Sequence, residues 1–141
     1  MIAILTADII NSRKLSSKIW INDLKAFLNT FGQSPNDWEI YRGDEFQLEI
    51  KNPEEALLVA FQLKAFFKSL KLDVRISIGF GEKTYKSRKI TESNGSAFIR
   101  SGETFDTLKK KKLNLAINSG DAFFDEELNL MLKLSLSFMD N

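Results

Sequence analysis

Apolar and polar residues alternate in short blocks along the chain, and these blocks predict the strands. The run from Ile2 to Ala7 is continuously apolar, which is typical of a central strand covered on both faces. The stretch from Trp38 to Ile50 alternates between apolar and polar residues, as the two strands of a half-buried hairpin do. The segments from Leu72 to Phe80 and from Leu113 to Ile117 alternate in the same way and predict two further strands.

Between these strands the buried positions recur every three or four residues, which predicts helices. Ser16 or Ser17 can cap the first of them. The second starts at Asn52-Pro53, a capping residue followed by a proline that suits the first helical position, and the third follows Gly95. The positions predicted to face the core are Trp20, Leu24, Phe27, Leu28 and Phe31 in the first helix, Ala56, Ala60, Leu63, Phe67 and Leu70 in the second, and Ala97, Ser101, Phe105 and Leu108 in the third.

The predicted elements follow one another as β-α-β-β-α-β-α-β-α, which indicates an α+β fold. A hairpin enclosed between two helical crossovers matches a ferredoxin-like palm with a βαββαβ core, to which a helix, a strand and a C-terminal helix are added. We assign residues 1–120 to this palm domain and residues 121–141 to a C-terminal apolar helix that links it to a missing or partner segment. In the palm topology the first strand and the hairpin are neighbours, so Asp8 is expected beside Asp44.

The C-terminal helix, predicted from Asp125 to Asn141, is apolar nearly all round. Its apolar residues are Leu128, Leu130, Met131, Leu132, Leu134, Leu136, Phe138 and Met139. The apolar surface of a terminal helix of this kind must be buried against another surface. Either it pairs with a second copy, which predicts a homodimer, or the natural chain continues beyond it.

Composition limits the class of protein. The 141 residues suffice for one domain with a core, and 43% hydrophobic and 28% charged residues are ordinary for a globular protein. A net charge of +1 provides no overall field that would attract nucleic acid or a membrane. No apolar run reaches the roughly 18 residues of a membrane span, and the N-terminus lacks the basic region of a signal peptide. We therefore expect a cytoplasmic protein without a membrane partner.

Neither cysteine nor histidine occurs in the sequence. This excludes disulfides, cysteine nucleophiles, histidine bases and zinc sites built on thiolate or imidazole. A metal ion would have to be held by oxygen ligands, which favours Mg²⁺ or Mn²⁺ as the cofactor, or Ca²⁺.

Acidic residues mark the ends of two predicted strands. Asp8 closes the first strand, and Asp44 and Glu45 stand at the tip of the hairpin, where Gly43-Asp44 is expected to form a two-residue type II′ turn. We interpret Asp8 and Asp44 as ligands of one divalent metal ion. Each also has an ordinary structural role open to it, Asp44 as a turn residue and Asp8 as a cap after a strand.

Basic residues gather in a polar loop from Glu82 to Asn94 and in the run from Lys109 to Lys112. The run closes the third helix, where the helix dipole favours cations, so a solvated helix end is the simplest interpretation and contact with nucleic acid is the alternative. Solvation is also the simplest interpretation of the loop.

Short motifs in the chain resemble known signalling domains. Ala7-Asp8-Ile9-Ile10-Asn11-Ser12 looks like the metal-binding start of class III nucleotidyl cyclase and GGDEF domains. Arg42-Gly43-Asp44-Glu45-Phe46 is similar to the GGDEF hairpin, with Arg42 in place of its first glycine. Nearly the whole chain resembles the N-terminal region of SatD family proteins. Those proteins carry the same opening aspartate, a similar hairpin, a strand like Val74 to Gly81, and a Gly-x-Ala-Phe segment, here Gly95-Ser96-Ala97-Phe98.

The resemblance implies roles for particular residues. In a cyclase palm, two carboxylates hold metal ions against a nucleoside triphosphate. Here these would be Asp8 and Asp44, with the Ile9 carbonyl as a third oxygen ligand. Glu45 would be the catalytic base or an outer ligand. The residues implied to contact the nucleotide or its phosphates are Asn11, Ser12, Arg13, Arg42, Gly43, Lys83, Arg88 and Arg100.

One departure from the cyclase pattern bears on catalysis. The cyclase helix usually carries Asn four residues and Arg eight residues after its glycine, but counted from Gly95 those positions hold Ile99 and Glu103. The resemblance therefore implies a regulatory protein that binds a nucleoside triphosphate or a cyclic nucleotide, with weak or lost catalysis. A helix-turn-helix-like region commonly follows the palm in the SatD family, so DNA contact is expected only through a segment outside this chain. The alternatives are a non-catalytic dimerisation module and an active nucleotidyl cyclase or transferase.

Overall fold

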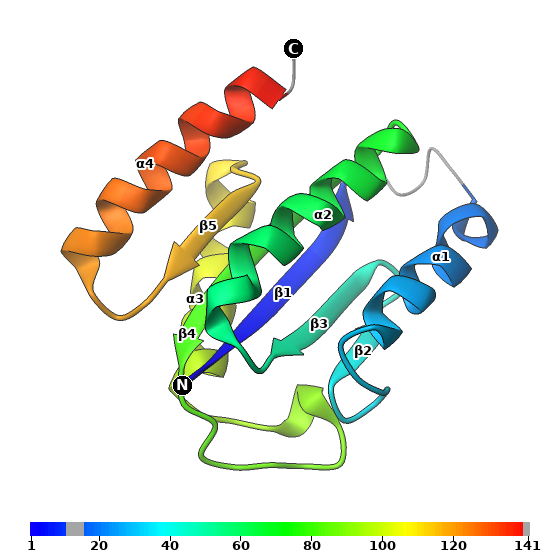
Figure 1. The fold of residues 1–141 in the computed structure, drawn as a ribbon, viewed down its shortest axis with the longest axis horizontal. Helices are drawn as coiled ribbons and strands as arrows, with labels where there is room; N and C mark the ends of the chain where they lie inside the picture. The colour runs from blue at the N-terminus through cyan, green and yellow to red at the C-terminus, as the bar shows by residue number, and fades with distance from the viewer. Residues whose placement is uncertain (11–15, 140–141) are drawn as a thin grey trace.

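A five-stranded mixed β-sheet runs through the molecule, with helices on both of its faces (Figure 1). The structure is a computed structural model that describes residues 1–10 and 16–139, apart from the side chains of Ser17, Phe138 and Met139. The sheet and helices confirm the predicted α+β class.

The strands are β1 (Ile2–Ile10), β2 (Trp38–Tyr41), β3 (Glu45–Ile50), β4 (Asp73–Gly81) and β5 (Leu115–Asn118). They lie side by side in the order β2-β3-β1-β4-β5. β1 is antiparallel to both β3 and β4, β2 is antiparallel to β3, and β5 runs parallel to β4. β1 is therefore the central strand, as its continuous apolar sequence predicts.

The helices are α1 (Ser17–Asn29), α2 (Ala56–Ser69), α3 (Ser96–Lys111) and α4 (Ala122–Met139), with short 3₁₀ turns η2 (Pro53–Glu55) and η3 (Ile90–Glu92). Two expected caps are present. The Ser16 hydroxyl accepts a hydrogen bond from the Lys18 N–H (3.3 Å), and the Asn52 side chain accepts one from the Glu54 N–H (3.2 Å). No helix within residues 16–139 has the length and apolar character needed to cross a membrane.

The main core lies between the sheet and helices α1, α2 and α4. Alternate residues of the strands point into it, and so do the predicted apolar stripes of α1 and α2. Trp20 and Leu24 of α1 and Leu132 of α4 are among its buried side chains. The rings of Trp20 and Phe46 both pack against Phe67 of α2, with ring centres 6.3 and 6.5 Å apart.

The opposite face of the sheet is more polar, and α3 packs mainly over β4, β1 and β5. A small second core beneath α3 consists of Ile4, Ile90, Ala97 and Phe98. Farther along α3, hydroxyl groups replace apolar contacts. The Ser101 and Thr6 hydroxyl oxygens lie 2.8 Å apart, and the Ser77 hydroxyl donates to the Ser101 carbonyl (2.7 Å). These bonds satisfy the polar groups that α3 buries against the sheet.

Gly79 allows α3 to approach β4 closely. A Cβ atom at this position would lie 2.3 Å from the Ala97 carbonyl oxygen and 2.4 Å from the Ser101 nitrogen. Both atoms belong to the helix backbone, which cannot move aside without shifting the helix. Because Gly79 has no side chain, the backbone of α3 can lie this close to the sheet.

The hairpin turn differs from the prediction. Tyr41 pairs with Glu45, so the connection has three residues, 42–44, and not the two of a type II′ turn. Arg42 and Gly43 both adopt a left-handed backbone, with φ of 51° and 82°. The prediction of a Gly43-Asp44 turn was therefore wrong, because it treated Arg42 as the end of the strand.

The register of the hairpin explains this length. Ile40 pairs with Phe46, and both side chains belong to the main core or pack against it. A two-residue turn would have paired Ile40 with Gln47, a polar residue of the opposite face. Burial of the apolar face therefore requires the additional loop residue.

Two other elements differ from the prediction at their ends. β5 begins at Leu115, because the Leu113 N–H still donates to the Leu108 carbonyl at the end of α3 (3.1 Å). α4 begins before the predicted Asp125, because the Asp121 carboxylate accepts a hydrogen bond from the Phe124 N–H (3.2 Å) and caps the first turn.

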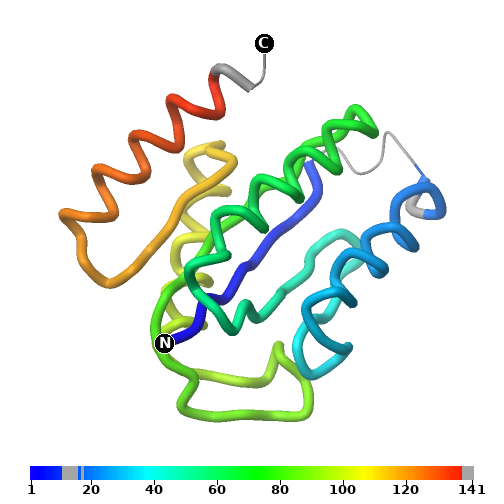
Figure 2. The backbone as a smooth tube through the Cα atoms, in the orientation of Figure 1, coloured from blue at the N-terminus to red at the C-terminus, as the bar shows by residue number. Residues whose placement is uncertain are grey.

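Residues 82–94, predicted as a polar loop, leave the end of β4 and return to α3 after passing the loop before β2 (Figure 2). Hydrogen bonds of Ile90 and Thr91 attach this excursion to the segment around β2. The Ile90 N–H donates to the Pro35 carbonyl (2.7 Å), and the Thr91 hydroxyl donates to the Glu39 carboxylate (2.7 Å). The loop is therefore anchored beside β2.

The close approach at Gly79 can be tested with two glycine variants. We expect Gly79→Ala to lower the free energy of unfolding by about 1–3 kcal/mol, because the new Cβ must displace the α3 backbone. Gly102, on α3, has no atom within 4 Å of a built Cβ. Gly102→Ala should therefore be neutral or stabilise by about 0.5–1 kcal/mol. Denaturant unfolding measures both, and equal stability of the two variants would contradict the packing described.

Candidate functional site

The end of β1 gathers charged side chains from three strands. Asp8 stands on the α3 side of the sheet, because Ala7 and Ile9 point into the main core on the other side. In the pairing register Asp8 lies opposite Glu45 of β3 on one side and opposite Arg75 of β4 on the other. Strand pairing therefore brings these three charged residues together.

Arg75 forms an ion pair with Asp8. Its Nη1 donates to Asp8 Oδ2 (3.0 Å) and Oδ1 (3.3 Å), and the two side chains are only 17% and 14% exposed. The Arg75 Nε is buried and has no hydrogen-bond partner in the described part of the chain. The guanidinium group therefore keeps a donor for a further acceptor.

Asp44 reaches the same end of the sheet from the hairpin loop. Its carbonyl accepts a hydrogen bond from the Ile9 N–H (3.1 Å). The N–H and C=O of a strand residue point to the same side, so the Ile9 carbonyl also faces this loop. The Asp44 carboxylate is close enough to Asp8 to raise the pKa of Asp8 by its charge. Asp44 is therefore a neighbour of Asp8 and Ile9, although it lies far from them in the sequence.

Glu45 pairs with a lysine of α3. Lys109 Nζ lies 3.1 Å from Glu45 Oε1 and 4.6 Å from the centre of the Phe105 ring. Lys109 is exposed in the last turn of α3, as the interpretation of a solvated helix end predicts, and it also pairs with Glu45 of the sheet. We refer to Asp8, Asp44, Glu45, Arg75 and Lys109 as the Asp8 cluster.

A polar groove opens beside this cluster, between α3 and the hairpin. Its volume is about 240 Å³. An adjoining hollow of about 340 Å³ shares Tyr41, Arg42 and Gln47 with it and adds Thr91. We call the two together the hairpin groove. The residues that line its first part are Thr6, Tyr41, Arg42, Glu45, Gln47, Gly102, Phe105, Asp106 and Lys109.

The pKa of Asp8 is raised above its ordinary value of 3.8. Burial is the main cause, and the negative charges of Asp44 and Glu45 add to it, whereas Arg75 and Lys109 lower the pKa. The two cations therefore do not fully offset the cost of burying the carboxylate. Additional positive charge beside Asp8 would stabilise its ionised form.

Tyr41 has a similar environment at the mouth of the hairpin groove. Burial, followed by the charge of Glu45, raises the pKa of the Tyr41 phenol to about 12. The hydroxyl therefore stays protonated near neutral pH and can donate a hydrogen bond to a molecule in the groove.

The donor atoms of the cluster have the chemistry that a hard cation requires. Asp8 and Asp44 supply carboxylate oxygens, and the Ile9 carbonyl faces the same loop. Within residues 1–10 and 16–139 there is no group of three or more acidic residues that could hold a metal ion. A divalent ion would therefore take two carboxylates from the protein, one of them shared with Arg75, and would complete its shell with oxygens from phosphate or water.

Two residues expected to bind phosphate lie toward the other end of β1. Lys83 Nζ pairs with the Glu49 carboxylate (2.6 Å), and Arg100 Nη1 donates to the Phe80 carbonyl (2.7 Å). Glu49 and Phe80 pair with the first residues of β1, four or five positions before Asp8. At about 3.3 Å per residue this is roughly 13 Å or more along the strand. The structure therefore does not bring Lys83 and Arg100 to the Asp8 cluster.

The remaining phosphate candidates have different positions. Arg42 and Gly43 occupy the hairpin loop next to Asp44, and Arg42 lines the hairpin groove. Arg88 is exposed in the loop that precedes η3. The other three candidates lie outside the described residues: Asn11, Ser12 and Arg13.

Arg75 and Lys109 belong to the cluster although the sequence pattern did not single them out. Arg75 lies between two inward-pointing residues, so strand alternation places it on the face of Asp8 once β4 is known to neighbour β1. Lys109 follows Phe105 by four positions and therefore shares its side of α3. Its position within a lysine run concealed this second signal.

The charge arrangement around Asp8 can be tested with two variants, one that removes a negatively charged neighbour and one that removes a positively charged neighbour. We expect Asp44→Asn to lower the pKa of Asp8, because it removes a negative charge. Lys109→Met should raise this pKa, because it removes a positive charge. The carboxyl carbon shift of Asp8, followed by NMR during a pH titration, measures both. A pKa that moved in the same direction in the two variants would contradict the arrangement.

No protein-family model matches the sequence, and a search of curated proteins finds no match.

Proposed function

We propose that this chain is the nucleotide-binding palm domain of a regulatory protein, resembling the SatD family and the class III nucleotidyl cyclase and GGDEF domains. In this proposal Asp8 and Asp44 hold Mg²⁺ or Mn²⁺ beside the phosphates of a nucleoside triphosphate or a cyclic nucleotide. Catalysis is weak or lost.

The order of the strands supports a palm. A ferredoxin-like βαββαβ unit has its strands in the order 2-3-1-4, and β2-β3-β1-β4 have this order with antiparallel neighbours. α3, β5 and α4 then correspond to the additions expected after the core. In such a unit the end of the first strand and the hairpin loop are neighbours.

The observation that carries the proposal is the convergence of Asp8 and Asp44. The Ile9 N–H donates to the Asp44 carbonyl, and the Asp44 charge acts on the pKa of Asp8. Glu45, which pairs with Asp8 across the strands and follows Asp44 in the chain, lines the hairpin groove, whose two parts have volumes of about 240 and 340 Å³. A polar groove beside a pair of acidic residues suits a ligand that arrives with its own cation.

The residues of the groove would act on a nucleotide as binding and orienting groups. A bound divalent ion would neutralise phosphate charge. Lys109, which lines the groove, could donate to phosphate oxygens as Glu45 turns to the cation, and Arg75 would orient Asp8. The Tyr41 hydroxyl and the Gln47 amide line the groove and would donate to a ribose or a base.

The helix that would supply the remaining cyclase groups lacks them. α3 carries Ile99 and Glu103 where cyclases usually have Asn and Arg. Arg100, the nearest basic residue, donates to the Phe80 carbonyl toward the other end of the sheet. Glu45 is paired with Lys109, which occupies one of its oxygens. These features support binding with weak or lost turnover, and they disfavour an active cyclase or transferase.

A thermal shift experiment tests the proposal. At a hundredfold excess over its dissociation constant, ATP or GTP with Mg²⁺ should stabilise the folded protein by about 2.7 kcal/mol and raise the midpoint by several degrees. Asp8→Asn and Asp44→Asn should each remove most of this shift.

Asp23→Asn is the matched control, because Asp23 is an exposed carboxylate of α1. It should leave the shift unchanged. The absence of a shift with any nucleotide, or an undiminished shift in Asp8→Asn, would reject the proposal.

A second function, a dimerisation module, is favoured by the surface of α4. Several large apolar side chains of this helix are more than half exposed: Phe123, Phe124, Leu130, Met131 and Leu134. Exposed apolar residues gathered on one element are a common mark of a protein interface. This function does not exclude nucleotide binding, because the Asp8 cluster lies at a different place on the sheet.

Sedimentation velocity tests the second function. If α4 forms a dimer interface, the protein should sediment as a dimer and Leu130→Glu with Leu134→Glu should produce a monomer, since each glutamate would be buried without a partner. Ile19→Glu on α1, which replaces another exposed apolar residue, serves as the control and should not change the state. A wild-type monomer at high concentration would rule out this function.

A further inference from the structure

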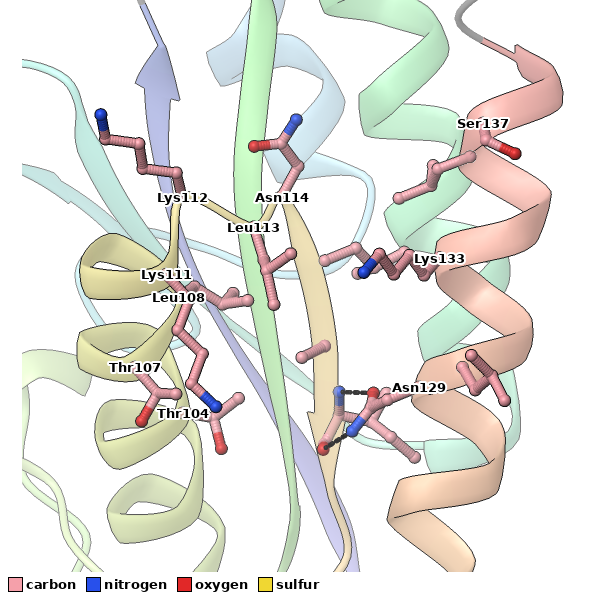
Figure 3. Close-up of a pocket in the computed structure, with 15 residues that line it drawn as sticks. Thr104, Thr107, Leu108, Lys111, Lys112, Leu113, Asn114, Asn129, Lys133 and Ser137 are labelled. Carbon is pink, nitrogen blue, oxygen red and sulfur yellow. Dashed lines mark hydrogen bonds between the residues drawn. The ribbon is translucent and has the colours of Figure 1, made fainter.

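The β5 edge of the sheet borders a groove that is separate from the Asp8 cluster. It has a volume of about 530 Å³ and lies between α3 and α4 (Figure 3). We call it the β5 groove. The lining residues that matter here are Lys111 of α3, Leu113 after it, Leu115 of β5, and Leu130, Lys133 and Leu136 of α4.

The floor of the β5 groove is the hydrogen-bonding edge of a strand. β5 is the last strand of the sheet and pairs with β4 on one side. The Asn114 carbonyl accepts from the Ile76 N–H on the β4 side (2.9 Å). The polar groups of a strand alternate in direction, so the N–H and C=O of Leu115 and Ile117 point away from β4, toward the groove.

Asn129 of α4 shows that this edge accepts a partner with the geometry of a peptide. Its side-chain amide meets both polar groups of Ile117: the Ile117 N–H donates to Asn129 Oδ1 (2.7 Å), and Asn129 Nδ2 donates to the Ile117 carbonyl (3.0 Å). The two bonds are drawn in Figure 3. A side-chain amide thus makes the pair of bonds that a neighbouring strand would make.

The same arrangement does not extend to Leu115. In the part of the chain that the structure describes, no side chain forms hydrogen bonds with both the N–H and the C=O of Leu115. The edge is therefore capped at one end, and the main-chain groups of Leu115 face the open part of the groove. An extended peptide could form hydrogen bonds there, with side chains alternating toward α3 and α4.

The charge around the groove is positive. Lys111 and Lys112 at the end of α3 and Lys133 of α4 line it and are exposed. Figure 3 shows Lys133 pointing from α4 toward β5. No acidic residue is among those that line the groove in the described part of the chain. Lysines on both walls, with apolar side chains between them, match a strand that carries both carboxylates and apolar residues.

We infer that the β5 groove binds an acidic peptide in extended conformation, which adds to β5 as a further strand. Its main chain bonds to Leu115, its apolar side chains contact Leu113 and Leu130, and its carboxylates pair with Lys111 and Lys133. A second copy of this chain fits less well, because two β5 edges would bring the same lysines together. Nucleic acid fits less well because it has no main-chain amides to match the strand edge.

Fluorescence anisotropy with a synthetic probe tests this inference. The probe is a labelled peptide of repeating glutamate–glutamate–valine–valine, which presents carboxylates and apolar side chains on both faces of an extended strand, and it should bind the wild-type protein. A lysine–valine peptide of the same length should not bind. The glutamate–valine peptide methylated on every second backbone nitrogen keeps its charge but loses its hydrogen bonds, and it should bind roughly tenfold more weakly or less well still.

Charge reversal in the protein separates the groove from the rest of the surface. Lys111→Glu with Lys133→Glu should weaken binding of the probe by roughly tenfold or more. The matched control is Lys18→Glu with Lys25→Glu, two exposed lysines of α1, which changes the net charge equally and should retain binding. Amide hydrogen exchange on the wild-type protein adds a measurement that needs no variant, since the probe should protect the Leu115 amide.

Several outcomes would overturn the inference. Equal binding of the methylated and unmethylated peptides would show attraction by charge alone. Equal loss of binding in both charge-reversal variants would place the contact outside the groove. Displacement of the probe by a single-stranded oligodeoxythymidine at equal concentration would assign the lysines to nucleic acid. A stable dimer that protects the Leu115 amide without any peptide would assign the edge to a second copy.

Discussion

The close packing of α3 on β4 and β1 is the constraint on which both surface sites depend. Gly79 has no side chain, and the backbone of α3 occupies the space that one would fill. The Ser101 hydroxyl, 2.8 Å from that of Thr6, fixes the helix further. Because α3 is held this close, one of its flanks forms a wall of the hairpin groove and the other forms a wall of the β5 groove. A shift of the helix would change both.

The Asp8 cluster illustrates how burial and charge oppose each other in a small protein. Burial raises the pKa of Asp8, although Arg75 and Lys109 act to lower it. Each of the two cations is already paired with a carboxylate, Arg75 with Asp8 and Lys109 with Glu45. In the proposed function, a ligand with its own cation would exchange the pair of Lys109 and Glu45 for new contacts, and Lys109 would then be available to an anion. The cluster is therefore suited to a ligand that brings charges of both signs.

The sequence predicted the elements better than their connections. The apolar stripes of the first three helices, the central strand and the caps at Ser16 and Asn52 are local patterns, and the structure confirms them. The type II′ turn was wrong because turn length depends on the register of Ile40 against Phe46, which composition at the turn does not reveal. The lysine run is exposed as predicted, but the pairing of Lys109 with Glu45 was not predicted, because it depends on how α3 crosses the sheet.

By itself, the sequence determined the order of strands and helices, the acidic ends of the first strand and the hairpin, and the absence of any histidine or cysteine chemistry. These properties follow from residue type and short-range periodicity. Only the tertiary structure decided that Arg75 faces Asp8, that Lys83 and Arg100 lie away from it, and that the groups of Leu115 face an open edge. The physical reason is that each depends on which strands are neighbours and on how a helix crosses them, and such contacts join residues far apart in the chain.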